Sequence, residues 1–356
     1  MTTRTRPYVA RPTIRIDGQE YAMVRELLTG MDLLETEGGM SQLQLRFTNF
    51  KSRERGRATF AFEDNQILKL GAAVAVYTGP EGQPQEIFRG LVTALEGHYT
   101  EGPPELVLLA EDAFQRARLD RRTKTHTQLT IKQLADDIAR RCSLTLVIDG
   151  FTDPIGPQVQ LNESDLAFLR RLLLRYGGDL QVVGSEMHVA HRSGVQRGTV
   201  NLEMHENLRR ARVVADLAHQ VSDVTITGWD AAQGRRITVT SQAAATGPGR
   251  GSTGASILQN WPLGRRSYHL GHLTIRNETE ARAVAGAAAD ERTRRFVTLE
   301  ATSVGTPAVR VGTHVQVTGL GDRFDNTYYV VRACHLYDLR QGYRTEFSAV
   351  CAYLGN

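Results

Sequence analysis

The chain has 356 residues and a net charge of +4, with 41% hydrophobic and 23% charged residues, the range of ordinary globular proteins. Its length predicts about two domains, and it is long enough to bury a core without disulfide bonds. Because the arginines are spread along the chain and are not gathered in one patch, the composition argues against a nucleic-acid-binding protein.

The cysteines Cys142, Cys334 and Cys351 include no closely spaced pair, which predicts free thiols in a reducing compartment and no disulfide framework. The N-terminal stretch MTTRTRPYVARP lacks the apolar core of a signal peptide. No stretch approaches the roughly 18 consecutive apolar residues that a membrane-spanning helix needs. We therefore expect no membrane span.

Residues 11–110 have the two-residue period of half-buried β-strands. In SQLQLRF, the apolar residues Leu43, Leu45 and Phe47 alternate with polar neighbours. Further strands are expected at 71–77, 87–96 and 105–110. Because every connection is short, the pairing is expected to be antiparallel.

Residues 111–195 change to a mixture of helices and strands. Thr130 and Gln133 have the spacing of a capping box and open an amphipathic helix, after which 144–148 forms a short strand. Further on, the Gly184-Ser185 pair separates two short strands and predicts a two-residue hairpin turn of the glycine-first type.

The stretch NESDLAFLRRLLLRYGG, residues 162–178, predicts a second helix. Asn162 is the expected N-cap, and Gly177 supplies the left-handed residue at the other end. Glu163 and Asp165 then lie in the first turn, where acidic side chains complement the helix dipole.

The remaining residues alternate between β-structure and one insertion. Strands are expected over 199–242 and again over 296–354, where Tyr343 to Tyr353 alternate with polar residues. The glycine-rich and serine-rich stretch 243–256 predicts a flexible loop. A third helix is expected at 278–294, with Asn277 and Glu280 in capping-box register.

Three groups of residues are candidates for chemistry. A glycosidase needs two carboxyl groups that face each other at about 5–10 Å, but Glu163 and Asp165, two apart on a helix, point about 200° away from each other. Capping and dipole compensation explain both. GRGSTG, 249–254, matches the phosphate-binding pattern G-x-G-x-x-G, but no hydrophobic strand precedes it, so we interpret it as a linker.

The histidine pairs are the third group. His188 and His191 lie in an expected strand, where residues three apart point to opposite faces and cannot share a metal. His269 and His272 meet the same objection less firmly, and neither pair has an acid or cysteine at ligand spacing. The sequence therefore predicts no catalytic, cofactor-binding or metal-binding residue.

Three stretches resemble the phage late-control D family, which comprises baseplate hub proteins of contractile phage tails and shares its segments with VgrG spike proteins. NESDLAFLRRLLLRYGGDL resembles the family's ESD-x-x-FL-x-RL segment, although Arg175-Tyr176 replaces the usual acidic helix end. VTITGWDAAQGRRITV, 224–239, is similar to its Gly-Trp-Asp strand and turn, and 309–349 to its closing strands. The matching residues are Glu163, Ser164, Asp165, Phe168, Leu169, Arg171, Leu172, Gly177, Gly178, Gly228, Trp229, Asp230, Gly312, Val315, Val317, Gly319, Tyr328, Val330, His335, Tyr343, Thr345 and Phe347.

The resemblance implies an α+β, mainly β fold with two tail-tube-like antiparallel β-barrels that carry α/β insertions. The expected division of the chain is a first barrel at 1–112, an α/β insertion domain at 113–199, a second barrel at 200–242 and 296–356, and a loop-helix insertion at 243–295.

The resemblance also implies a structural, non-enzymatic baseplate hub of a contractile phage tail or contractile injection system. Such a hub is a homotrimer that joins the hexameric tail tube protein to a trimeric spike. Because the chain ends at Asn356, directly after the last expected strand, a separate spike protein is expected. Other baseplate proteins are expected partners, with assembly in the bacterial cytoplasm and a final place in the virion tail baseplate or injection particle. No cofactor is expected.

Two other classes of function remain open at this point. A tail-associated cell-wall hydrolase would need an opposed acid pair or a zinc triad in a cleft, and a nucleic-acid-binding module would show strongly salt-dependent binding of DNA.

Overall fold

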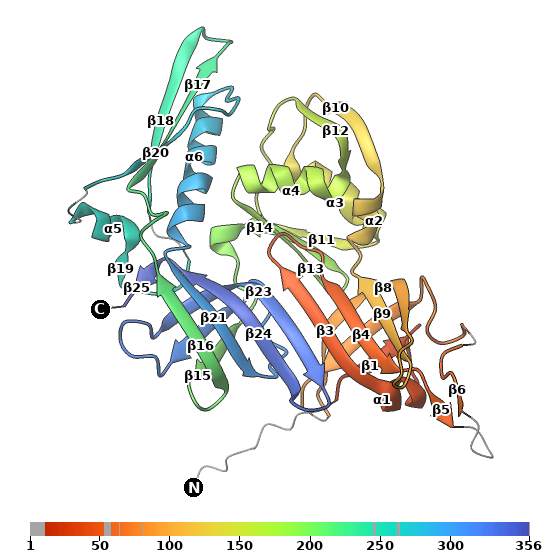
Figure 1. The fold of residues 1–356 in the computed structure, drawn as a ribbon. Coiled ribbons are helices and arrows are strands. Elements are labelled where there is room, and N and C mark those ends of the chain that lie inside the picture. Colours follow the sequence, from red (N-terminus) through yellow and green to blue (C-terminus); the bar gives the residue numbers. More distant parts are fainter. Residues whose placement is uncertain are drawn as a thin grey trace.

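A computed structural model of the chain describes residues 11–52, 58–63, 65–80, 82–244, 247–260, 262 and 264–355. The fold is mainly β, with one large sheet at the base and two insertions above it (Figure 1). The mainly β class with α/β insertions is therefore confirmed. No helix in the described ranges is long and apolar enough to cross a membrane.

The N-terminal half of the large sheet is built from antiparallel strands in the order β3-β4-β9-β8-β7-β1-β2. Their bounds, with those of the helix and the small ribbon in this half, are β1 (Thr13–Ile16), β2 (Gln19–Glu20), α1 (Ala22–Leu27), β3 (Leu28–Thr36), β4 (Gln42–Thr48), β5 (Lys51–Ser52), β6 (Ala58–Thr59), β7 (Ala73–Thr78), β8 (Gln85–His98) and β9 (Glu105–Glu111). As predicted, Leu43, Leu45 and Phe47 of β4 point into the core of this half.

The C-terminal half has the strand order β16-β21-β24-β23, with β22 pairing β23 and β15 pairing β22. These strands are β15 (Thr199–Glu203), β16 (Leu208–Ala215), β21 (Val297–Val304), β22 (His314–Thr318), β23 (Asn326–Asp338) and β24 (Gly342–Cys351). The alternation predicted for the tail is confirmed, because Tyr343, Thr345, Phe347 and Ala349 of β24 are buried.

The two halves meet along one seam. β23 pairs antiparallel with β3, in a register that runs from Arg332 opposite Thr36 to Asp338 opposite Gly30. This ladder makes the two halves one thirteen-stranded sheet. The hydrogen-bonded order runs from β16 to β2 and does not return to its start among the described strands, so the sheet is open. The number of barrels stays a prediction.

The first insertion lies above the N-terminal half. Its elements are α2 (Gln115–Leu119), β10 (Arg121–His126), α3 (Ile131–Cys142), β11 (Thr145–Ile148), β12 (Gln158–Ser164), α4 (Asp165–Arg175), β13 (Gly178–Val183), β14 (Glu186–His191) and a 3-10 turn (Arg192–Gly194). β10 and β12 form a two-stranded ribbon, and β11, β14 and β13 form a small sheet. The predicted capping box of Thr130 and Gln133 opens α3 with both of its hydrogen bonds.

Helix α4 begins two residues later than the sequence predicts. Ser164 is the N-cap, and its hydroxyl accepts the Ala167 N–H at 3.2 Å. Asn162 was the expected cap, but β12 pairs with β10 as far as Ser164, so Asn162 and Glu163 lie in the ribbon. The other end follows the prediction, because Gly177 has a left-handed φ of 67°.

The second insertion stands above the C-terminal half (Figure 1). It contains β17 (Asp223–Asp230), β18 (Arg235–Gln242), β19 (Ser252–Thr253), α5 (Gly254–Gln259), β20 (Ser267–Leu270) and α6 (Glu278–Thr293), while β25 (Tyr353–Leu354) pairs with β19. The sheet β18-β17-β20 packs its apolar residues, such as Val224 and Ile237, against Val284 of α6. Residues 223–242, expected in the second barrel, therefore belong to a separate sheet, because their apolar face meets α6.

The expectation of a flexible loop over 243–256 is wrong for its second half, whereas 245–246 lie outside the described residues. Residues 252–253 form β19, and Thr253 caps α5 by accepting the Ser256 N–H at 3.0 Å. Gly251 has a φ of +126°, and a Cβ atom there would lie 2.0 Å from the Leu354 carbonyl oxygen. The glycines therefore permit a close crossing of two backbones and do not form a phosphate cradle.

This crossing predicts that Gly251→Ala destabilises the protein more than Gly247→Ala does. Both glycines have positive φ, which costs a residue with a side chain about 1–2 kcal/mol, but no atom lies within 4 Å of the Cβ position at Gly247. Only the Gly251 variant adds a clash with Leu354. Urea denaturation of both variants measures the difference, and equal losses of unfolding free energy would show that the crossing is not tight.

Candidate functional site

The acidic pair that the sequence singles out has structural partners. Glu163 receives two hydrogen bonds from the Arg171 guanidinium, at 3.1 and 2.9 Å. Asp165 is buried, forms a salt bridge with Arg141, and lies 3.4 Å from the Arg122 guanidinium. Both carboxylates tie α4 to neighbouring segments of the insertion, and neither faces the other across a cleft.

The histidines are also engaged locally. His188 and His191 lie on β14, as predicted; His188 bonds Glu186 at 2.9 Å, and His191 stacks on Phe151 at 4.2 Å between ring centroids. His269 lies on β20, 3.1 Å from the Thr227 hydroxyl, and His272 follows that strand. In the part of the chain that the structure describes, no group of three or more His, Cys, Asp or Glu side chains could hold a metal ion.

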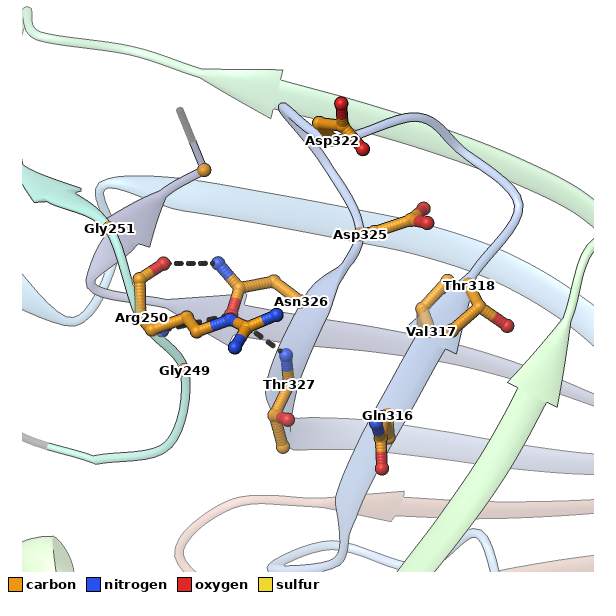
Figure 2. A pocket seen from close by; sticks show the side chains of 11 residues that line it. Gly249, Arg250, Gly251, Gln316, Val317, Thr318, Asp322, Asp325, Asn326 and Thr327 are labelled. Carbon is orange, nitrogen blue, oxygen red and sulfur yellow. Dashed lines mark hydrogen bonds between the residues drawn. The ribbon is translucent and has the colours of Figure 1, made fainter.

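A hollow lies where β22 and β23 meet the glycine segment. It encloses about 920 Å³ and is lined by Gly249, Arg250, Gly251, Gln316, Val317, Thr318, Asp322, Asp325, Asn326, Thr327 and Gly355. The Asn326 amide holds the glycine segment in place by accepting the Arg250 N–H at 3.0 Å and donating to the Arg250 carbonyl at 2.9 Å (Figure 2). Asp325 accepts the Gly319 and Leu320 N–H groups.

The chemistry of this hollow fits contact with a polar surface. Its charged side chains are one arginine, Arg250, and two aspartates, of which Asp325 already caps a turn. Nucleophilic catalysis would need a base within hydrogen-bond reach of a nucleophile. The lining residues include no histidine, cysteine or lysine to supply such a pair.

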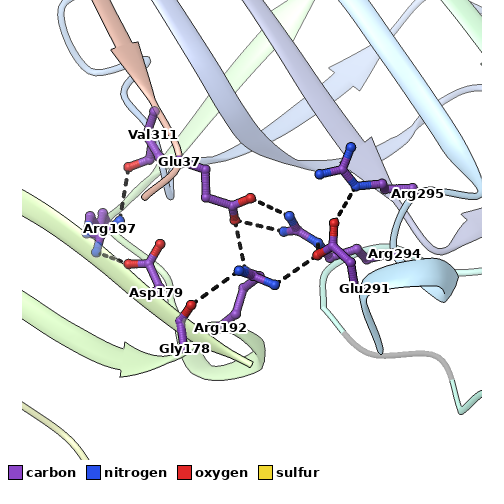
Figure 3. Close-up of polar contacts among 9 residues, drawn as sticks. All are labelled: Glu37, Gly178, Asp179, Arg192, Arg197, Glu291, Arg294, Arg295 and Val311. Carbon is purple, nitrogen blue, oxygen red and sulfur yellow. Dashed lines mark hydrogen bonds and ion pairs between the residues drawn. The ribbon is translucent and has the colours of Figure 1, made fainter. Parts of the chain in front are cut away.

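A buried ion network joins the large sheet to both insertions. Glu37 directly follows β3, and its carboxylate binds Arg192 of the first insertion and Arg294 at the end of α6 (Figure 3). The side chains of Glu37, Arg192 and Arg294 are only 13%, 10% and 8% exposed. Both arginines also bind Glu291, at 2.8 and 2.9 Å. Three segments far apart in sequence therefore share one charged cluster.

The charges in this network stabilise each other. Burial alone would raise the pKa of Glu291, but Arg294, Arg192 and Arg295 outweigh burial and hold that pKa below its usual value. Local patterns could not predict this site, because Glu37, Arg192 and Arg294 are separated by about a hundred residues or more, which is beyond any helical or strand period. The only local pairs in the network, Glu291 with Arg294 and Arg295, have the spacing of an ordinary salt bridge on a helix surface.

A second buried polar cluster lies on the seam. Arg310 binds Glu35 of β3 through two nitrogens, and the Glu35 side chain is completely buried. His335 of β23 is also fully buried, and its Nδ1 lies 2.8 Å from the Tyr343 hydroxyl. Burial lowers the pKa of His335 to about 4. Thr78 of the N-terminal half donates to the same Tyr343 hydroxyl at 3.2 Å, so hydrogen bonds cross between the halves.

Comparison with known proteins places the fold. The family model described as "Alg8 N-terminal domain" matches residues 49–338. The 43 kDa tail protein of prophage MuSo2 from Shewanella oneidensis is 15% identical, with a TM-score of 0.70 over 96% of this chain and 98% of that one. A tail protein from Neisseria meningitidis is 14% identical, with a TM-score of 0.66 over 96% of each chain. No curated protein sequence matches.

A further solved structure with this fold comes from a secretion system. It is an E. coli component of the type VI secretion system, and it is itself described as structurally similar to tail proteins of bacteriophage T4. This protein is 12% identical, with a TM-score of 0.61 over 96% of this chain and 78% of that one. At these identities the comparisons show a shared fold. The role of the chain as a tail protein and its membership of the late-control D family stay predictions.

The ion network predicts that Glu37→Ala lowers the unfolding free energy by about 3 kcal/mol or more, because it leaves two buried guanidinium groups short of a counter-charge. Glu300→Ala is the matched control, since Glu300 is 67% exposed in its contact with Arg212. That variant should cost less than about 1 kcal/mol. Urea denaturation measures both; a Glu37 effect as small as the Glu300 effect would contradict a structural role for the network.

The pKa of His335 predicts that acid destabilises the fold. The unfolded chain binds a proton near pH 6.5 and the folded chain only near 4, so the unfolding free energy falls across this window. The loss is about 3 kcal/mol at 1.36 kcal/mol for each pKa unit. Between pH 7 and 4, the stability of His335→Asn should therefore depend less on pH than that of the natural chain.

Asp112 provides a control with the opposite sign. Burial raises the pKa of this carboxyl to about 6, so the folded chain takes up a proton before the unfolded chain and gains stability as the pH falls through 6. Asp112→Asn should therefore steepen the acid loss that His335→Asn reduces. If both variants shifted the pH profile in the same direction, the two assigned causes would be wrong.

Proposed function

The chain belongs to the Alg8 N-terminal domain family; from the fold that it shares with phage tail proteins, and not from this membership, we propose that it is the structural baseplate hub of a contractile phage tail or contractile injection system. In this proposal three copies form a ring that joins the hexameric tail tube to a trimeric spike. The observation that supports it most is the fusion of two β halves into one sheet through β3 and β23.

Symmetry explains why one chain would carry two halves. A closed trimer repeats any one surface three times, whereas a six-fold tube needs six similar docking surfaces. The two halves contribute comparable sets of antiparallel strands, β3, β4, β7, β8 and β9 in one and β16 and β21 to β24 in the other. Each chain can therefore offer two docking surfaces, and three chains can offer six.

The open ends of the sheet support ring formation. β16 pairs only with β21, and β2 pairs only with β1, so both ends of the sheet leave strand edges without a partner among the described residues. Unpaired edges bind other strands readily. In the proposed ring, the β16 edge of one copy lies against the opposite open end of the next copy, which closes the sheets around a common axis.

The remaining parts of the proposal concern partners and chemistry. The tail tube, a separate spike and other baseplate proteins bind the hub, and the chain performs no catalysis. It assembles in the bacterial cytoplasm and ends in the baseplate of the virion or injection particle. The hydrolase alternative has no specific support, because Glu163 and Asp165 are bound by arginines, and Asp325, one of the two aspartates in the hollow beside Arg250, already accepts two backbone N–H groups.

Native mass spectrometry of the chain co-expressed with the neighbouring tube and spike proteins tests the proposal. We expect a complex with three hub chains for three spike chains. We expect no complex of hub and tube without spike in which the number of hub chains differs from three. A complex with six hub chains, or with a single hub chain for each spike trimer, would contradict it. A monomer of the isolated chain would not, because partners contribute binding energy to the assembled ring.

A further inference from the structure

The sheet β18-β17-β20 has one face that packs on α6 and one that faces solvent. Alternation along the strands sends Val224, Ile226, Ile237 and Val239 to α6. The opposite face therefore carries the intervening side chains, which are Thr225, Thr227, Trp229, Arg236, Thr238, Thr240 and His269. The β17–β18 hairpin projects beyond the end of α6 (Figure 1), so its tip stands clear of the rest of the chain.

This hairpin is rigid at its tip. Asp230 is buried and accepts the Ala232 and Gln233 N–H groups at 3.0 and 3.1 Å, which fixes the turn, and Gly234 takes a positive φ of 61°. Along the stem, the Thr225 and Thr240 hydroxyls bond across the two strands at 2.8 Å. Trp229 is nevertheless 60% exposed. A large aromatic side chain on a rigid support, left in water, is typical of a protein-binding surface.

The outer edge of β18 is open to strand pairing along its centre. β18 pairs with β17 along its whole length, from Gln242 opposite Asp223 to Arg235 opposite Asp230, without a shift in register, and no described strand lies on its other side. Natural edge strands are blunted by charged side chains, especially lysine, by proline, by bulges or by a short length. The charged residues of β18, Arg235 and Arg236, stand at its first end, and the strand contains no lysine or proline. Its centre, Ile237 to Thr240, consists of β-branched residues that favour a strand.

The charge at this edge has one sign. Arg235 and Arg236 form no ion pair or hydrogen bond with the rest of the described chain, and Asp230, the nearest acid in the hairpin, is occupied by the turn. The one carboxylate that alternation places on this face, Asp223, is only 11% exposed and lies 3.9 Å from the Arg265 guanidinium. Arg236 lies opposite Trp229 on the solvent-facing side, whereas Arg235 lies on the other face at the hairpin tip. The exposed charge at this end of the hairpin is therefore positive, which favours a partner that carries carboxylates.

We propose that the β18 edge binds an extended acidic segment of another protein, which adds to the sheet as a further strand. Its backbone pairs with β18, its carboxylates lie beside Arg236, and its apolar side chains continue the layer that covers α6. This mode of recognition takes affinity from the backbone ladder and specificity from alternate side chains. The surface is separate from the large sheet, so the inference does not depend on the proposed ring.

A peptide-binding experiment on the full chain tests this proposal. The probe is a fluorescent peptide of about eight residues, the length of a typical strand, in which glutamate and valine alternate. One control peptide carries lysine in place of glutamate, and another has a central proline, which interrupts a strand ladder. We expect the acidic peptide to bind, and both controls to bind at least tenfold more weakly, as measured by fluorescence anisotropy.

Protein variants locate the binding. Trp229→Ala and Arg236→Glu should each weaken binding of the acidic peptide at least tenfold, and Arg236→Glu should reduce the preference for glutamate over lysine. Arg340→Glu is the matched control, since it reverses an exposed arginine on a distant hairpin of the large sheet and should change nothing. Thermal melts of all three variants confirm that they are folded.

Several results would overturn the inference. If the acidic peptide does not bind, or if Arg340→Glu weakens binding as much as Arg236→Glu, the edge does not select an acidic strand. If the proline peptide binds equally well, attraction between charges explains the binding without strand addition. If the chain instead forms dimers that Trp229→Ala dissolves, the occupant of the edge is a second copy. The trimeric ring would be unaffected by each of these results.

Discussion

The antiparallel ladder between β3 and β23 is the contact on which the rest of the structure depends. Without it, the chain would consist of two small sheets, each with a long unpaired edge. The ladder also carries the polar residues of the seam. Glu35 on β3 binds Arg310, and His335 on β23 reaches Tyr343, so buried charges and hydrogen bonds fix the register as well as the backbone does.

The same strand positions the insertions. Glu37, at the end of β3, holds Arg192 from one insertion and Arg294 from the other. Replacing a buried ion network with apolar residues can leave stability unchanged or raise it, so such a network specifies one arrangement more than it adds stability. In the proposed hub, this specificity keeps both insertions at fixed angles to the sheet, and load applied by the tube or spike reaches all three units together.

Much of the fold follows from local patterns. The alternation in β4 and β24, the capping box at Thr130 and the turn at Gly184 are predictable, because each depends on residues within a few positions. The start of α4 is not predictable in this way. Asn162 is as good a cap as Ser164, and only the pairing of β12 with β10 decides between them.

Long-range packing explains the other differences. Strands 223–242 have a regular pattern that fits a large sheet or a small one equally well, and only their contact with α6 assigns them to the insertion. In the sequence, the glycines near 249–251 have the pattern of a linker. Their close approach to Leu354 leaves no local signal, because it joins residues about a hundred positions apart. The candidate catalytic and metal sites could be judged from the spacing of nearby residues. The ion network could not be found in this way, since charges paired across the fold leave no spacing pattern.

A cryo-electron-microscopy reconstruction of the assembled tail end, with tube, hub and spike in place, tests the central claim most directly. Our account predicts three hub chains whose six β halves lie in one ring, with the β3–β23 seam inside each chain and similar surfaces of all six halves turned to the tube. Six hub chains that each contribute one half, or a trimer in which only one half of each chain meets the tube, would contradict it.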